Sequence, residues 1–234
     1  MPRPWTLLDF ILVVVGGLVG SGLAVGAAAL LDDSEVVLVL ALAGQYLGHL
    51  LVLWALYRRK GGPDLGFTIE GRDVLYLGAG LFLQLAMAVL FLPLTSLLFP
   101  DGEPAQQISS ALSGLETTAA KVTAIVTAVV IAPVTEELTF RGVLLKSLET
   151  RGRRFVMVVT ALVFSAFHLL GLDPANMLRA SVVVLPQLFV VGLLLAWLTL
   201  HNNRLGPAIF LHSGFNLLAA VVLLLPSDLL ESVG

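Results

Sequence analysis

Seven apolar segments separated by short polar stretches restrict this chain to one class of fold. A helix that crosses a membrane needs roughly 20 mostly apolar residues. Charged residues make up 12% of the sequence, whereas a soluble domain carries about 25%, so there are too few to cover a water-facing surface. We expect an all-α fold, a polytopic membrane helical bundle of about seven transmembrane helices with a buried polar pocket. The expected spans are 7–31, 36–57, 74–99, 119–145, 155–170, 180–200 and 205–225.

The connecting stretches are short and contain no recognisable linker, internal repeat or soluble domain. Residues 1–234 are therefore expected to form a single transmembrane domain. A cleaved signal peptide is an alternative for segment 7–31, but its apolar core is longer than the ~7–15 residues of such signals. The polar stretch 100–118 has apolar residues at helical spacing, which predicts a helix along the membrane interface. The sequence contains no cysteine, which excludes thiolate metal sites, and it shows no basic pattern typical of nucleic-acid binding.

The charged loops alternate in sign along the chain. Basic residues gather near Arg3, at 58–60, at 146–154 and at Arg204, whereas the intervening loops are acidic or nearly neutral. Cytoplasmic loops carry the excess of Lys and Arg. Seven spans with a cytoplasmic N-terminus put every basic loop on the cytoplasmic side, and they predict that the C-terminus lies outside.

Polar side chains in three of the predicted spans lie at similar depths. At a rise of about 1.5 Å per residue, Glu136 lies roughly 15 Å from the basic end at Lys146. His168 lies about 21 Å from Arg154 by the same measure. His212 and Asn216 lie about 12 and 18 Å from Arg204. Because a charge near the bilayer centre is costly, an ionisable residue there is a candidate for function. A shared, water-containing pocket would explain the common depth.

The spacing of these residues indicates different tasks. Glu137 and Arg141 are four apart on a helix and can form a buried ion pair. Glu136 is rotated by about 100° from Glu137, so it faces elsewhere and remains a free carboxylate. His168 could share a water molecule with Glu136 and assist proton transfer.

Two further residues of the seventh span could serve the same pocket. His212 and Asn216 project from one helix face, since they are also four residues apart. Together they could donate hydrogen bonds to a developing oxyanion. A plain contact between helices is the simpler interpretation of this pair taken alone.

Three motifs in this region resemble those of a known family. Residues 136–142, Glu-Glu-Leu-Thr-Phe-Arg-Gly, resemble the Glu-Glu-x-x-x-Arg motif of the CAAX protease and bacteriocin-processing family. Residues 164–168, Phe-Ser-Ala-Phe-His, resemble its Phe-x-x-x-His motif, and residues 212–216, His-Ser-Gly-Phe-Asn, resemble its His-x-x-x-Asn motif. The motifs occur in the family's order, each on its own predicted helix. The resemblance covers about residues 118–225 and implies that they form the catalytic core.

The resemblance implies an intramembrane endopeptidase related to the type II CAAX prenyl endopeptidases. In that family the residues corresponding to Glu136 and His168 activate water, and those corresponding to His212 and Asn216 form the oxyanion site. Glu137 and Arg141 would support Glu136. The implied partners are membrane lipid and a peptide or prenylated-peptide substrate. A zinc ion held by Glu136, His168 and His212 remains an option. We prefer a mechanism without a cofactor, because His212 and Asn216 make sense as donors without a metal.

Two alternatives remain open at the level of the sequence. A non-catalytic immunity or scaffold protein, or a transporter, would also bury polar residues in its spans. A transporter is expected to show paired broken helices in two halves, whereas the polar residues here lie mainly in one half. Gln45 and His49 of the second span fit the depth of the same pocket, but a hydrogen bond between helices is the simpler interpretation of them.

Overall fold

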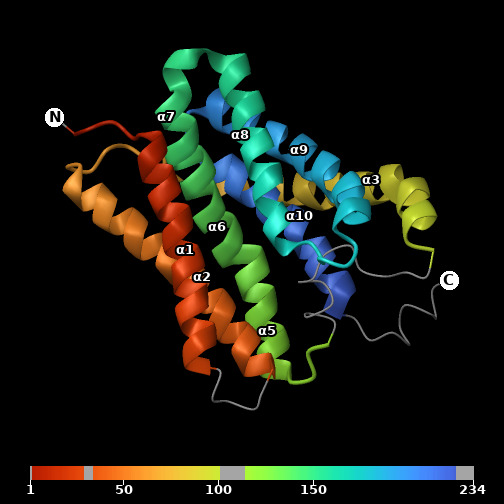
Figure 1. The fold of residues 1–234 in the computed structure, drawn as a ribbon. Helices are drawn as coiled ribbons and strands as arrows, with labels where there is room; N and C mark the ends of the chain where they lie inside the picture. The colour runs from red at the N-terminus through yellow and green to blue at the C-terminus, as the bar shows by residue number, and fades with distance from the viewer. Residues whose placement is uncertain (1, 29–33, 101–113, 225–234) are drawn as a thin grey trace.

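The computed structural model describes residues 2–28, 34–100 and 114–224 of the 234-residue chain, and these form a bundle of helices without a β-strand (Figure 1). The predicted interfacial helix falls mostly on residues outside these ranges. Within the described residues, each of the seven predicted spans is helical over most of its length. Six helical stretches are long and apolar enough to cross a membrane, and Gly206–Val221 is a shorter apolar helix. The prediction of a helical membrane bundle is confirmed. The principal helices are α1 (Leu7–Ala28), α2 (Ser34–Arg59), α3 (Leu75–Leu98), α8 (Arg153–Phe167), α9 (Met177–Asn202) and α10 (Gly206–Leu224).

The fourth span is a composite helix from Thr118 to Arg151. It begins as α5 (Thr118–Val126), widens into a π-helical segment at Thr127–Ile131, and returns to α-helix as α6 (Ala132–Glu137). A second π-helical segment, Leu138–Leu145, leads into α7 (Lys146–Leu148). Pro133 explains the first change of register, because proline has no N–H to donate and its ring displaces the carbonyl four residues earlier. The two glutamates of the first motif therefore lie in a short α-helical piece between two π-helical segments.

Helices α1 and α2 form a closely packed hairpin at the N-terminal side of the bundle. Gly20 and Gly44 approach so closely that a Cβ atom on either would collide with the carbonyl oxygen of the other. Gly48 packs in the same way against Gly16. Small residues at four-residue spacing permit such an approach in membranes. A Cβ atom added at Gly22 or Gly26 would meet nothing within 4 Å, so that second glycine pair has no packing partner among the described residues.

The basic residues at one end of the bundle are held by ion pairs. Lys60 Nζ lies 2.8 Å from Asp9 Oδ2, which ties the two ends of the hairpin. Lys146 Nζ lies 2.6 Å from Asp64 Oδ2. The loop between α2 and α3 crosses this end, and its Gly66 carbonyl accepts a hydrogen bond from Leu205 N at 2.8 Å. The basic ends of the helices therefore lie together, as the alternating loop charges require.

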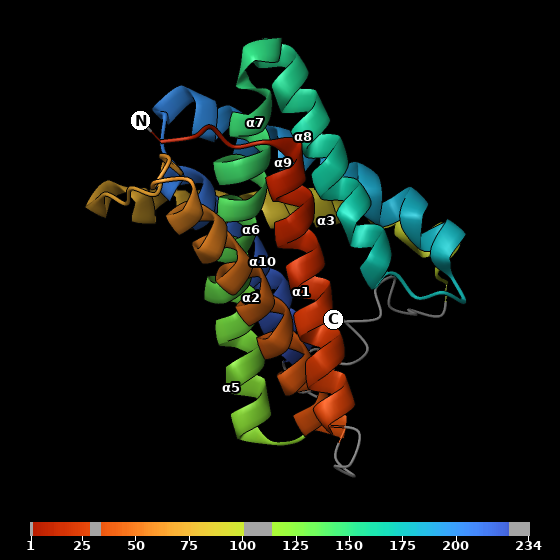
Figure 2. The ribbon, with the colours of Figure 1, turned by 60° about the vertical axis from the view of Figure 1, so that its left-hand side comes forward.

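Helix α6 lies between the N-terminal hairpin and α10 (Figure 2). α10 contacts α3 on its opposite side, where a Cβ atom at Gly214 would collide with the Leu77 carbonyl. His212 and Asn216 lie on the other face of α10, because residues two positions away point about 200° around the helix. Close packing of Gly214 on α3 thus turns both side chains toward the composite helix that carries Glu136.

Candidate active site

The centre of the candidate site is a buried cluster of Glu137, Arg141 and His212. Glu137 and Arg141 have no solvent exposure. Oxygen Oε1 of Glu137 lies 3.0 Å from Arg141 Nη1 and also 3.0 Å from His212 Nδ1. The predicted ion pair between Glu137 and Arg141 is present. His212, which follows Glu137 by 75 positions in the sequence, bonds the same carboxylate oxygen. Arg141 also donates from Nη2 to the carbonyl oxygen of Gly192 in α9, at 3.1 Å. One ion pair therefore connects the composite helix to α9 and α10.

The hydrogen bond to Glu137 fixes how the His212 ring can be used. A carboxylate paired with arginine only accepts hydrogen bonds, so His212 Nδ1 must carry the proton. The other ring nitrogen, Nε2, then faces Glu136 at 3.8 Å from its Oε2 atom. That distance is too long for a direct hydrogen bond, but one water molecule could bond both atoms. A ring nitrogen and a carboxylate oxygen thus face the same small space.

Glu136 is the carboxylate without a partner in this cluster. Its side chain is 16% exposed, and its buried Oε2 atom has no hydrogen-bond partner. Buried polar atoms are normally hydrogen-bonded, so such an atom calls for a ligand or water. Glu136 and Glu137 thus lie on either side of the His212 ring, and the catalytic role of Glu136 stays a prediction.

The buried ring of Phe164 contacts the rings of both histidines that the sequence singled out, His168 and His212. The ring centroid of Phe164 lies 4.8 Å from that of His168 and 5.7 Å from that of His212, both edge-to-face. The guanidinium carbon of Arg141 lies 4.6 Å from the same centroid, a cation–π distance. His168 Nδ1 lies 2.8 Å from the carbonyl oxygen of Phe164, so Nδ1 carries the proton and Nε2 of the neutral ring is free to accept one. The motif phenylalanine is a packing centre that residue spacing alone did not single out.

Asn216 makes a contact that the sequence did not predict. Its Nδ2 atom donates to the carbonyl oxygen of Ala128 at 2.9 Å. Within the π-helical segment, the Ala132 N–H bonds to the Thr127 carbonyl. The next donor in that register would come from Pro133, which has no N–H. The side chain of Asn216 therefore satisfies a carbonyl that the helix itself leaves open, and its role as an oxyanion donor stays a prediction.

A metal ion does not fit the side chains as they are placed. Zinc sites in enzymes use three protein ligands, and the sequence offers Glu136, His168 and His212 for them. Among residues 2–28, 34–100 and 114–224, no group of three His, Cys, Asp or Glu side chains is placed to hold a metal ion. The choice between a zinc ion and no cofactor remains a prediction.

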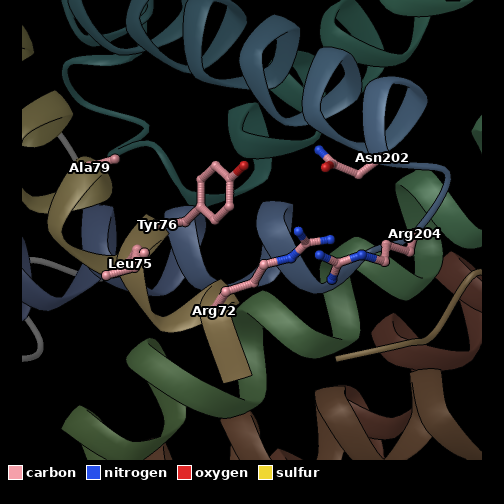
Figure 3. A pocket seen from close by; sticks show the side chains of 6 residues that line it. All are labelled: Arg72, Leu75, Tyr76, Ala79, Asn202 and Arg204. Carbon is pink, nitrogen blue, oxygen red and sulfur yellow. The ribbon is translucent and has the colours of Figure 1, made fainter. Parts of the chain in front are cut away.

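A separate cavity of about 350 Å³ lies at the basic end of the bundle (Figure 3). Glu70 lies between its two arginines, 2.6 Å from Arg72 Nε and 3.1 Å from Arg204 Nε. Arg204 Nη2 also donates to Asp73 at 2.8 Å, and this hydrogen bond raises the pKa of Arg204. The arginine charges are thus balanced by carboxylates, and the cavity is distinct from the Glu136 cluster. It is lined by Arg72, Leu75, Tyr76, Ala79, Asn202 and Arg204.

One comparison with known proteins gives a match. Residues 118–218 match a family model described as type II CAAX prenyl endopeptidase Rce1-like. The matched segment runs from the start of α5 into α10 and contains all three motifs. No curated protein and no solved structure matches the chain.

Proposed function

We propose that this chain, whose residues 118–218 match the family model of the type II CAAX prenyl endopeptidases, is an intramembrane endopeptidase that hydrolyses a peptide bond with a water molecule activated by Glu136. The main support for this proposal is the Oε2 atom of Glu136, which is buried without a hydrogen-bond partner beside the Glu137–Arg141–His212 cluster. A general base must lie within reach of the proton that it removes, directly or through one water. Glu136 Oε2 and His212 Nε2 lie 3.8 Å apart, so a single water molecule bonded to both atoms would meet this requirement.

In the proposed reaction, Glu136 takes a proton from the water as its oxygen attacks the peptide carbonyl carbon. The carbonyl oxygen then becomes an oxyanion. When the C–N bond breaks, the proton moves from the Glu136 carboxyl group to the leaving amine, giving a carboxylic acid and an amine as products; the acid then gives its proton to the amine, which leaves a carboxylate and an ammonium ion. His168 would orient the water through its unprotonated Nε2 atom. This assignment is consistent with the hydrogen bond that fixes the proton on His168 Nδ1.

His212 and Asn216 are the proposed oxyanion donors. For His212 this role requires a protonated ring, since Nδ1 is committed to Glu137 and Nε2 must also carry a hydrogen. The charges of Glu136, Glu137, Arg141 and His212 then sum to zero, which suits a site within a membrane. Asn216 would need to share its amide between the Ala128 carbonyl and the substrate.

Glu137 and Arg141 are proposed to hold the site rather than to react. Both are fully buried, and Glu137 Oε1 is shared by Arg141 and His212. A carboxylate that receives two such donors keeps the His212 ring in one orientation. The proposed chemistry involves no cofactor; if activity survives chelators in a preparation free of metal, the zinc alternative is excluded.

The proposed substrate is a membrane-bound peptide, with a prenylated peptide as one form. We place the site toward the cytoplasm, with the N-terminus cytoplasmic and the C-terminus outside. This orientation follows from the cluster of Lys60, Lys146 and Arg204 at one end of the bundle and from the positive-inside rule.

Substitution of Glu136 tests the proposal. Purified protein in detergent would be incubated with a farnesylated peptide and with unmodified membrane peptides, and products would be identified by mass spectrometry. We expect Glu136→Gln to lower cleavage at least ~100-fold, the low end for loss of a general base, with unchanged thermal stability. The matched control is Glu149→Gln, at an exposed carboxylate. An active Glu136→Gln variant would refute the role of Glu136; a wild type without cleavage of any peptide would favour a non-catalytic membrane protein.

A further inference from the structure

The cavity at the basic end of the bundle lies between the ends of two membrane-spanning helical stretches. One of these stretches begins at Gly71 and the other ends at Asn202, and both contribute side chains to the lining. Where a span of membrane-crossing length ends, the polar headgroups of the lipids begin. The cavity therefore borders the headgroup layer of the membrane.

The lining of the cavity changes from polar to apolar along α3. Arg72 precedes this helix, Leu75 is its first residue, and Ala79 follows one turn later, about 6 Å deeper. Leu75 is 75% exposed, so the apolar side of the cavity continues into the lipid-facing surface of α3. The volume of about 350 Å³ is in the range of roughly 300–1,000 Å³ of small-ligand sites. A charged rim above an apolar wall matches an amphipathic ligand.

Three polar side chains of the lining have unused hydrogen-bonding capacity. Arg72 binds Glu70 through Nε at 2.6 Å, and within the described ranges its two terminal nitrogens have no partner. Asn202 uses one amide hydrogen for the Leu198 carbonyl, at 2.9 Å, which leaves the second hydrogen and the side-chain oxygen. Nor does the Tyr76 hydroxyl bond to any residue that the structure describes. Figure 3 shows this hydroxyl and the Asn202 amide pointing toward one another, with the Arg72 guanidinium below them.

The charges around the cavity sum to zero. Arg204 is bound to Asp73 and to Glu70, and Arg72 is bound to Glu70 as well. Two positive and two negative side chains therefore face one another. A ligand with only a negative charge would disturb this balance, whereas a zwitterionic ligand keeps it. Glu70, with a side chain that is 41% exposed, can accept further hydrogen bonds from the positive group of such a ligand.

We propose that the cavity binds the headgroup of a zwitterionic phospholipid that carries a phosphate and a primary ammonium group. The phosphate accepts hydrogen bonds from the terminal nitrogens of Arg72 and from the Tyr76 hydroxyl. The ammonium group donates to Glu70 and to the side-chain oxygen of Asn202. Arginine suits the first role because its planar donors match the oxygens of a phosphate. The beginning of an acyl chain lies against Leu75.

A lipid in this position connects two helices that otherwise pack at their opposite ends. Phe99, next to the end of α3, shares an apolar cluster with Ala180 and Val184 of α9. At the basic end, α3 supplies Tyr76 to the cavity and α9 supplies Asn202. The headgroup therefore bridges the two helices there. A ligand that binds only the folded state stabilises it, so the melting temperature should rise when this lipid is added.

Binding can be measured on delipidated wild-type protein in detergent, by native mass spectrometry and thermal unfolding, with phosphatidylethanolamine as the probe. We expect Arg72→Gln to weaken binding of this lipid about 10- to 100-fold, the effect of losing a charged hydrogen bond. Tyr76→Phe should weaken it about 2- to 10-fold, as for a neutral one. The matched control is Arg59→Gln, at an exposed arginine at the end of α2 and outside the cavity. It should bind the lipid as wild type does.

Substitution of Glu70 tests the charge type of the lipid. Wild-type protein should bind phosphatidylethanolamine more tightly than the anionic phosphatidylglycerol. Glu70→Gln removes one negative charge, which leaves the site with a net positive charge, and keeps an oxygen that accepts hydrogen bonds. This variant should reverse the preference in favour of phosphatidylglycerol.

Three outcomes would overturn the inference. Equal binding of phosphatidylethanolamine by wild type, Arg72→Gln and Tyr76→Phe would show that the lipid does not bind in this cavity. Tighter binding of phosphatidylglycerol by the wild type would refute the zwitterionic headgroup. Stabilisation by inorganic phosphate as large as that by the lipid would identify a site for a free anion instead. None of these measurements uses peptide cleavage, so the result is independent of the proposed function.

Discussion

Two buried arginines in this protein each pair with a carboxylate, but the two ion pairs differ in how fully their hydrogen bonds are satisfied. At the basic end, Arg204 binds Asp73 through both Nη atoms and Glu70 through Nε. Within the bundle, Arg141 binds Glu137 and the Gly192 carbonyl, but its Nε atom has no partner. The second oxygens of Glu136 and Glu137 also lack partners. The first cluster is satisfied internally, whereas the second has unmet hydrogen-bonding capacity.

The difference separates a structural cluster from a reactive one. The satisfied ion pairs at the basic end join residues 70–73 to Arg204, just before α10, and need nothing further. A buried carboxylate without a partner is unfavourable unless water or a ligand meets it. Burial alone would not have made this distinction, because both arginines are almost fully buried.

The largest expected effect comes from removing Arg141. Replacing it by methionine leaves Glu137 buried with only His212 as a partner, which should destabilise the fold by about 3–5 kcal/mol. Thermal unfolding in detergent measures this. The double variant Arg141→Met with Glu137→Gln removes the charge as well and should recover part of the stability. Equal stability of the single and double variants would contradict the uncompensated charge as the cause.

A smaller effect is expected at the satisfied cluster. Asp73→Asn keeps the size of the side chain but loses the charge that binds Arg204, which should destabilise the fold by about 1–3 kcal/mol. Peptide cleavage at a temperature where the variant is folded should equal that of wild type, because this cluster is distinct from Glu136. A selective loss of kcat in Asp73→Asn would mean that the two clusters are coupled.

The smallest expected effect concerns Asp64, whose side chain is 81% exposed. The hydrogen bond from Lys146 lowers the pKa of Asp64 below its usual value. The stabilising contribution is therefore present above the unfolded pKa of about 3.9, and it is lost as the pH falls through the lower, folded value. The difference in melting temperature between wild type and Lys146→Met should be small at pH 7 and should shrink as the pH falls below the unfolded pKa of Asp64. A difference that grows on acidification would contradict this sign.

The sequence predicted the helices and the local ion pair because both depend on near neighbours. Apolar runs of membrane-spanning length identify each span. The four-residue spacing of Glu137 and Arg141 is sufficient to place those side chains together. The different directions of Glu136 and Glu137 also follow from near neighbours, since their relative rotation is set by the helix itself.

The contacts between helices could not be predicted in the same way. The bond from His212 to Glu137 depends on how α10 is rotated against α6, and packing at Gly214 sets that rotation. The bond from Asn216 to Ala128 depends on a π-helical register, whereas the apolar pattern of the sequence predicts regular α-helix throughout. Pro133 was the available signal for that irregularity. The effect of Pro133 on Asn216, which lies on another helix, could not be predicted from the sequence.

The π-helical segment at Thr127–Ile131 also implies a sensitivity to chain length. A π-helical turn accommodates one residue more than the α-helix around it. Deleting a single residue from Thr127–Ile131 should therefore let the helix close into regular geometry and free the Asn216 amide. Because the wide turn absorbs the extra residue, α5 would keep its rotation relative to the two glutamates. A shortening by one amino acid, with every motif intact, would thus remove one connection between the composite helix and α10.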